Sequence, residues 1–177
     1  MDFETRQKEN WLSTFHIYAD GLNDGKVTSL IDFVNNTQGE LTIGINSGGG
    51  SNAIRLFVQK LFEENQDRIT LVGLVGVYSA AFELFYNFKG KRVMTDNLCG
   101  MVHRSYISGI SIDSSKAPTH DEMKAMLSGM YAASEADEQF AQSFMTPYEF
   151  ERYKKGDDVY FDFKRMKQIF PDVEVWE

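Results

Sequence analysis

The sequence predicts an α/β fold in which repeated β-α-β units build a mostly parallel sheet flanked by helices. Short apolar segments alternate with segments of helical period along residues 14–90. The run RITLVGLVGV at 68–77 is almost continuously apolar, which is typical of a strand buried on both faces of a parallel sheet. No linker rich in Pro, Gly or Ser divides the 177 residues, so we expect one domain over 1–177.

The first half of the chain supplies most of this alternation. TFHIYADG at 14–21 predicts a strand that ends in a turn, KVTSLIDFVNN at 26–36 a helix, and GELTIGI at 39–45 a second strand. AIRLFVQKLFEEN at 53–65 predicts another helix before the strand at 68–77. The apolar residues of that helix share a helical spacing: Ile54, Leu56, Phe57, Leu61 and Phe62.

From Ser79 the apolar residues follow a helical spacing, and Gly90 is the predicted end of this helix. KRVMTD at 91–96 and LCGMVHRSYI at 98–107 predict two short strands, and the polar segment 108–118 predicts a loop.

A long helix follows this loop and continues to Phe144. It carries a stripe of apolar residues at helical spacing: Met123, Met126, Leu127, Met130 and Tyr131. We interpret the stripe as core, with an adaptable interface as the alternative. Residues 146–176 predict a helix, a turn, another helix and a terminal strand or tail, and residues 1–12 a flexible or helical extension.

Composition and charge exclude several classes of protein. The net charge of −8, with no basic cluster beyond KGKR at 89–92, argues against binding to nucleic acid. The N-terminus is charged where a signal peptide is apolar, and no apolar run approaches the length of a membrane span. The single cysteine, Cys99, rules out an internal disulfide framework and agrees with a reducing compartment. We therefore expect a cytoplasmic protein that binds no membrane.

The sequence favours neither a metal site nor a cofactor. Its three histidines are far apart, and neither H-E-x-x-H nor C-x-x-C is present. Gly48, Gly50 and Ala53 satisfy G-x-G-x-x-A, but no acid ends the next strand and no lysine follows the glycines. The glycines suit close approach of the backbone to an oxyanion or a peptide; the alternative is a tight turn without a function.

Ser79 and His103 suit nucleophilic catalysis. Ser79 lies between a predicted strand and a predicted helix, where open α/β sheets bind ligands, and the N–H of Ala80 is placed to meet an oxyanion. The alternative for Ser79 is a plain helix N-cap. His103 closes an apolar strand and could act as the base, or be structural. Cys99 lies four residues before it, about 13 Å along an extended strand, so we interpret Cys99 as packing.

Four segments in this order resemble the proteolytic subunit of the caseinolytic (Clp) protease, ClpP. INSGGGS at 45–51 is similar to the family's I-N-S-P-G-G loop, and GVYSAAF at 76–82 stands where the family has G-Q-A-A-S-M-G-A. GKRVMTDN at 90–97 resembles its G-K-R strand, and GMVHRS at 100–105 its M-I-H-Q-P segment. The resemblance implies the ClpP/crotonase-like fold, with a long helix after the catalytic histidine, and a serine endopeptidase.

The resemblance also implies a set of site residues. Ser79 is the nucleophile, His103 the general base and Asp158 the acid, with Asp157 as the alternative acid. The residues VYF after Asp158 best suit the family's short hydrophobic step. The implied oxyanion hole and substrate loop comprise Gly49, Gly50 and Ala80, with the N–H groups of Gly50 and Ala80 as donors.

The partners that the resemblance implies are a peptide or unfolded-protein substrate and further copies of the chain in stacked rings. In the family, the long helix makes the contact between rings, so the methionine-rich stripe is a candidate for it. The resemblance also implies an AAA+ ATPase partner, although MDFETRQKEN has no match to the loops that engage it.

Some positions depart from the family pattern and support two alternatives. Gly48 replaces a proline, Tyr78 an alanine and Ala81 a glycine, and Arg104 follows the histidine in place of glutamine. Tyr78 and Arg104 could narrow or recharge a substrate groove. The first alternative is therefore a catalytically silent ClpP-like scaffold, and the second is an acyl-CoA enzyme of the related crotonase fold.

Overall fold

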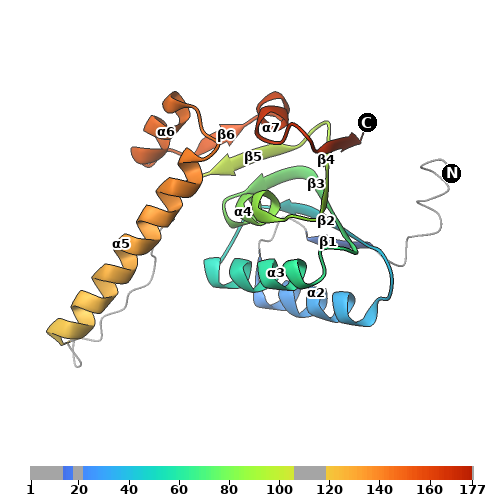
Figure 1. Cartoon of the computed structure of the whole chain (residues 1–177), viewed down its shortest axis with the longest axis horizontal. Helices are drawn as coiled ribbons and strands as arrows, with labels where there is room; N and C mark the ends of the chain where they lie inside the picture. Colours follow the sequence, from blue (N-terminus) through green and yellow to red (C-terminus); the bar gives the residue numbers. More distant parts are fainter. Residues whose placement is uncertain (1–13, 18–21, 106–118, 177) are drawn as a thin grey trace. The chain divides into compact units, whose positions relative to one another are not determined.

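The computed structural model describes residues 14–17, 22–105 and 119–176 of the chain (Figure 1). They form two compact units, one of the described residues within 1–101 and 160–176 and one of those within 102–159. The expectation of one domain stays a prediction. The predicted extension at 1–12 and loop at 108–118 lie outside the described residues.

The first unit is built on a parallel sheet. Its strands lie in the order β1-β2-β3-β4-β7, and each neighbouring pair is parallel. The strands are β1 (Thr14–Ile17), β2 (Leu41–Ser47), β3 (Ile69–Tyr78), β4 (Lys91–Thr95) and β7 (Glu174–Trp176). The far half of β3 also pairs in parallel with β5 (Cys99–Val102), and β5 pairs with β6 (Val159–Phe161). The predicted α/β architecture, with β-α-β units and a mostly parallel sheet, is confirmed.

Helices connect the successive parallel strands of this unit, as the alternating pattern predicts. They are α2 (Asp24–Asn36), α3 (Asn52–Glu64) and α4 (Ala80–Asn87), and α7 (Phe163–Ile169) precedes the last strand. The chain thus returns to the same edge of the sheet after each helix, so the carboxyl ends of β2 and β3 lie together.

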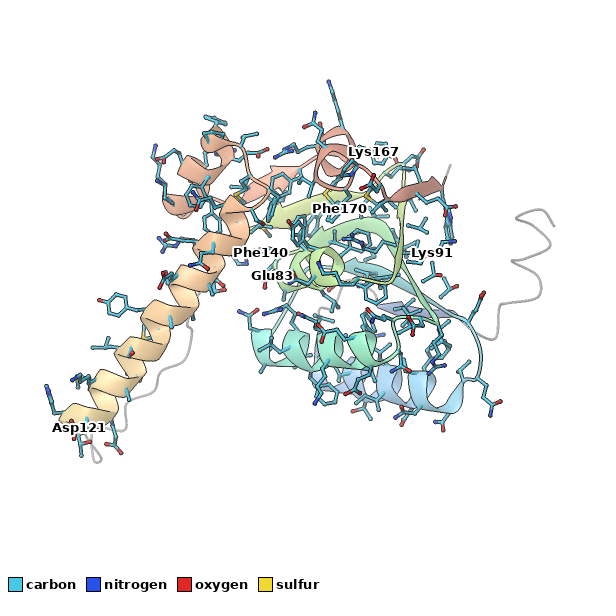
Figure 2. All side chains as sticks on the ribbon, viewed as in Figure 1. Glu83, Lys91, Asp121, Phe140, Lys167 and Phe170 are labelled. Atoms are coloured by element: carbon cyan, nitrogen blue, oxygen red, sulfur yellow. The ribbon has the colours of Figure 1, made fainter. Side chains whose placement is uncertain are left out.

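Helix α4 lies in the core of the first unit. Aromatic residues surround it: the Phe85 and Phe170 rings meet edge to face with centroids 5.3 Å apart, and Phe82 packs on Phe161 at 5.6 Å. Figure 2 labels Phe170 among the side chains of this unit. Arg92 closes the carboxyl end of the helix by donating to the Phe85 carbonyl at 3.2 Å. Burial of these aromatic rings holds the short helix in place.

The second unit contains α5 (His120–Gln142) and α6 (Pro147–Lys154). Both helices begin with a capping box, in which Thr119 pairs with Glu122 and Thr146 with Glu149. Such boxes satisfy backbone N–H groups that a helix start leaves without partners. Among the described residues, no helix is both long and apolar enough to cross a bilayer.

Two predictions about apolar faces are wrong. In α3, Leu56 and Phe57 are 56% and 52% exposed, whereas Val58 and Phe62 are buried. Leu56 lies about 200° around the helix from Ile54, so the two cannot share one buried face. The α5 stripe is not core either: Met123, Met126, Leu127 and Tyr131 are exposed.

Candidate active site

Ser79 occupies the turn between β3 and α4 in a conformation that is costly for a residue with a Cβ. Its φ is 54° and its ψ −125°, and within the described residues no other non-glycine residue has a positive φ. Its N–H donates to the Met101 carbonyl at 2.7 Å, and its carbonyl accepts from Phe82 and Glu83. Its hydroxyl does not cap α4, so the plain N-cap alternative does not hold.

The glycine loop packs directly against Ser79. Gly49 and Gly50 have φ values of 100° and 145°, which favour glycine. A Cβ on Gly49 would lie 2.7 Å from the Tyr78 carbonyl oxygen and 2.8 Å from the Ser79 Cβ. Only glycine therefore allows the loop to come this close to the serine.

Two backbone amides at this turn, one in the loop and one at the start of α4, have no partner among the described residues. The Gly49 N–H donates to the Ser47 hydroxyl at 3.2 Å, and the Gly49 carbonyl accepts from Leu22 at 2.7 Å. Within the described part of the chain, the N–H groups of Gly50 and Ala80 donate no hydrogen bond. Of the three residues expected in the oxyanion hole, these two have the amide available.

Sequence reasoning missed two residues that hold the loop. Ser47 is 2% exposed and accepts from Gly49, and the Asn46 side chain accepts from the Gly76 N–H at 3.0 Å. The register of β2 against β3 shifts between Ile45 and Ser47. Such irregularities redirect a strand end. Both residues belong to INSGGGS, so their place in that segment was the available signal.

In the second unit, His103 faces Asp158. The His103 Nδ1 lies 3.8 Å from Asp158 Oδ1, within reach of an ion pair but longer than a hydrogen bond. Asp157 instead binds Arg152, with Nε and Oδ2 3.0 Å apart. The structure thus places Asp158, and not Asp157, opposite the histidine.

Arg104 does not present an unpaired charge. Its Nη2 lies 2.8 Å from Glu138 Oε1 and 3.0 Å from the Ser134 hydroxyl, both on α5. These contacts tie the segment that carries His103 to α5. The expectation that Tyr78 and Arg104 narrow or recharge a substrate groove stays a prediction, and any charge effect of Arg104 acts together with that of Glu138.

Tyr78 turns back along its own strand. A Cβ on Gly76 would lie 2.7 Å from the Tyr78 ring, and the Tyr160 ring meets that ring edge to face at 6.2 Å. Burial raises the pKa of the Tyr78 hydroxyl, and the nearby Cys99 and Tyr160 add to the shift. The hydroxyl is therefore neutral at physiological pH. Cys99 is half-buried, with its Sγ 3.7 Å from the Asn97 carbonyl oxygen.

The predicted site residues fall into two groups. Ser79, Ala80 and the glycine loop come together in the first unit, and His103 and Asp158 come together in the second. The pairing of Ser79 with His103 stays a prediction. Among the described residues, no cluster of three or more His, Cys, Asp or Glu side chains could hold a metal ion.

No protein-family model matches the sequence, and no curated protein matches it. The solved structure of a mutant ClpP1 from Listeria monocytogenes matches with a TM-score of 0.66. The match covers 98% of this chain and 96% of that chain at 18% sequence identity. The chain has a ClpP-like fold. At this identity the likeness shows the ClpP-like fold alone, and the chemistry of the site is a separate question.

Proposed function

We propose that the chain is a serine endopeptidase of the ClpP type with Ser79 as its nucleophile. The conformation of Ser79 carries the proposal, because a serine is held at positive φ between a parallel strand and a buried helix. Backbone strain at such a turn is characteristic of exposed nucleophiles. The glycine loop against the Ser79 Cβ adds backbone amides beside the reacting oxygen.

In this mechanism, Ser79 Oγ attacks the carbonyl carbon of a peptide bond while His103 takes the hydroxyl proton. The N–H groups of Gly50 and Ala80 stabilise the negative charge that develops on the carbonyl oxygen. The C–N bond then breaks, and His103 returns the proton to the leaving amine. Water, deprotonated by His103, hydrolyses the ester on Ser79 and restores the enzyme.

Two observations support His103 and Asp158 in these roles. Met101, whose carbonyl accepts from the Ser79 N–H, precedes His103 by two residues. The Asp158 carboxylate faces His103 Nδ1, and a carboxylate there favours the tautomer whose Nε2 accepts a proton.

The proposed substrate is an extended peptide or an unfolded protein. A glycine loop beside a parallel strand suits a peptide that binds as an added strand, and the mechanism uses no cofactor. The proposed assembly is a homo-oligomer of stacked rings that uses the exposed α5 stripe. Three residues of the stripe, Met123, Leu127 and Tyr131, line a groove of about 490 Å³ together with His120, Lys124 and Ser128. An AAA+ ATPase that delivers unfolded chains is the proposed partner.

A fluorophosphonate probe tests the proposal. The assembled protein should be labelled at Ser79, and Ser79→Ala should abolish labelling and lower peptide hydrolysis by at least about 10⁴-fold. Light scattering coupled to size-exclusion chromatography should show an oligomer at micromolar concentration. An oligomer that takes no label would contradict the peptidase.

A second candidate is a catalytically silent ClpP-like scaffold. The distance of 3.8 Å between His103 and Asp158 favours it, since an acid that orients its histidine normally hydrogen-bonds to it. Catalytic hydrogen bonds often tighten only when substrate binds. The labelling experiment separates the candidates, because the scaffold assembles but does not react.

A further inference from the structure

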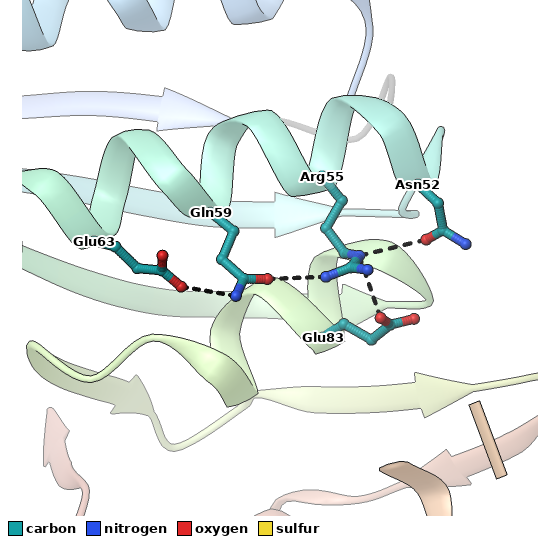
Figure 3. Close-up of polar contacts among 5 residues, drawn as sticks. All are labelled: Asn52, Arg55, Gln59, Glu63 and Glu83. Carbon is teal, nitrogen blue, oxygen red and sulfur yellow. Dashed lines mark hydrogen bonds and ion pairs between the residues drawn. The ribbon is translucent and has the colours of Figure 1, made fainter. Parts of the chain in front are cut away.

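Arg55 and Glu83 form an ion pair inside the first unit, shown in Figure 3. The Arg55 Nε lies 3.2 Å from Glu83 Oε2, and the two side chains are 13% and 18% exposed. Exposed ion pairs contribute little to stability, but a largely buried pair is screened less and has a defined geometry. The pair therefore constrains the two helices that it joins.

The two helices are those that begin at the proposed active site. Arg55 lies in the first turn of α3, which starts two residues after Gly50. Glu83 lies in the first turn of α4, which starts at Ala80, and its N–H donates to the Ser79 carbonyl at 3.1 Å. The ion pair thus joins the helix ends that follow the two available amides.

Arg55 is not placed to stabilise its own helix. A cation in the first turn faces the positive end of the helix dipole, and the first turn of α3 has no acidic residue to offset it. Neighbours on α3 instead hold the guanidinium in place: Gln59 Oε1 accepts at 2.9 Å and Asn52 Oδ1 at 3.4 Å (Figure 3). Gln59 is held in turn by Glu63 at 2.8 Å.

We propose that the Arg55–Glu83 ion pair is a positioning device that sets the separation of the Gly50 and Ala80 amides. This inference rests on the proposed function, in which those amides form the oxyanion hole. Because the oxyanion forms in the transition state and the tetrahedral intermediate and not in the bound substrate, a change in their separation lowers kcat and leaves KM nearly unchanged.

Peptide hydrolysis by the full-length assembled protein tests the proposal through kcat and KM. Arg55→Gln should lower kcat by about 10- to 100-fold with KM within about twofold of the wild-type value. Glu83→Gln should have a smaller effect, and the double variant should be no worse than Arg55→Gln, because the residues act as one unit. Arg55→Lys keeps the charge and should restore part of kcat.

Lys91→Gln is the matched control. It removes an ion pair of similar length in the same unit, Lys91 to Glu174 at 3.4 Å, whose side chains are more than half exposed. It should leave both kinetic constants unchanged. Wild-type kcat in Arg55→Gln, or additive losses in the double variant, would overturn the positioning role.

Hydrogen exchange measured by mass spectrometry tests the positioning role without relying on peptidase activity. If the wild-type protein neither labels nor hydrolyses peptides, the peptidase fails while the positioning role is still tested. Exchange in peptides covering 48–53 and 79–84 should then accelerate in Arg55→Gln and not in Lys91→Gln. Unchanged exchange at both places would reject the positioning role.

Discussion

Helix α4 is held by its surroundings, whereas helix α5 is held by its own capping and backbone. Five of the eight residues of α4 are buried, and its N-cap, Ser79, makes no side-chain capping bond. In α5, 23 residues long, Ala141 is the buried residue, and a capping box formed by Thr119 and Glu122 starts the helix. The short helix would not form alone, but the long one has local means to do so.

The two kinds of packing suit two different roles. A nucleophile must keep its position to a fraction of an ångström, so a helix packed on every side suits it. An exposed apolar face is instead typical of an interaction surface, and the proposed homo-oligomer uses this one. Substitutions in or beside α4 and substitutions in α5 should accordingly change different quantities, and the four predictions below run from the largest expected effect to the smallest.

Phe85→Ala should have the largest effect. The Phe85 ring is fully buried against Phe170, so its loss should lower the free energy of unfolding by about 3–5 kcal/mol. Tyr131→Ala on α5 is the control: within a single chain that side chain is 75% exposed, so at concentrations where the chain is monomeric we expect a change within about 0.5 kcal/mol. Urea denaturation of the two variants measures both. Similar losses would show that α5 is as firmly packed as α4.

Gly49→Ala should disturb the site beside α4. The new methyl group would meet the Tyr78 carbonyl at 2.7 Å and Ser79 Cβ at 2.8 Å, in addition to the strain of a φ of 100°. We expect a loss of about 1–3 kcal/mol in stability and a fall of about 10²-fold in fluorophosphonate labelling.

Gly39→Ala is the matched control for that change. Gly39 has a φ of 82°, but nothing lies within 4 Å of its added Cβ. It should therefore share the backbone strain, about 1 kcal/mol, and keep the full labelling rate. Equal labelling of the two variants would show that the glycine loop does not approach the reacting serine.

Gly129→Ala should raise the free energy of unfolding, whereas the changes above lower it. Gly129 lies inside α5, and apart from its chain neighbours and the backbone of its own helix, no atom of a described residue lies within 4 Å of its added Cβ. Because alanine loses less backbone entropy in a helix, we expect a gain of about 0.5–1 kcal/mol, visible as a higher Tm. A destabilised variant would indicate that another chain packs against this position.

The smallest effect should be a pH dependence at the start of α5. Hydrogen bonds from the Thr119 N–H and hydroxyl hold the pKa of Glu122 below its ordinary value of 4.5. Because the pKa of Glu122 is lower in the folded state, the ionised carboxylate contributes to the stability of the helix above pH 4.5. That stability is lost as the pH falls through the folded pKa. Far-UV circular dichroism should show less helix at acid pH. A glutamine at this position cannot titrate, so Glu122→Gln should remove the part of the helix loss at acid pH that Glu122 causes.

Much of the fold could be predicted because each element carries a local pattern. The continuous apolar run of β3 and the helical periods of α2 and α3 place the parallel β-α-β units without any tertiary information. The buried face of α3 could not be predicted with the same success. Leu56 and Val58 are equally apolar, and only the neighbouring elements decide that Val58 is covered.

Some residues of the candidate site could likewise be predicted from the local sequence, and others could not. Ser79 and the glycine loop are recognisable from residue type and order, because a strand-to-helix turn and a close backbone approach need those residues. Local pattern could not choose between Asp157 and Asp158, which are one residue apart; the chain turns one toward Arg152 and the other toward His103.

The order of strands and helices, and the residue types at the turns, follow from the chain's local preferences and its apolar period alone. Three-dimensional packing was needed to find the Gly50 and Ala80 amides, which have no partner in the described segments, the Asn46 contact with Gly76 and the Arg55–Glu83 ion pair. The physical reason is distance along the chain. These polar partners lie about 30 residues apart, and no periodicity in a sequence specifies which donor meets which acceptor once the helices have packed.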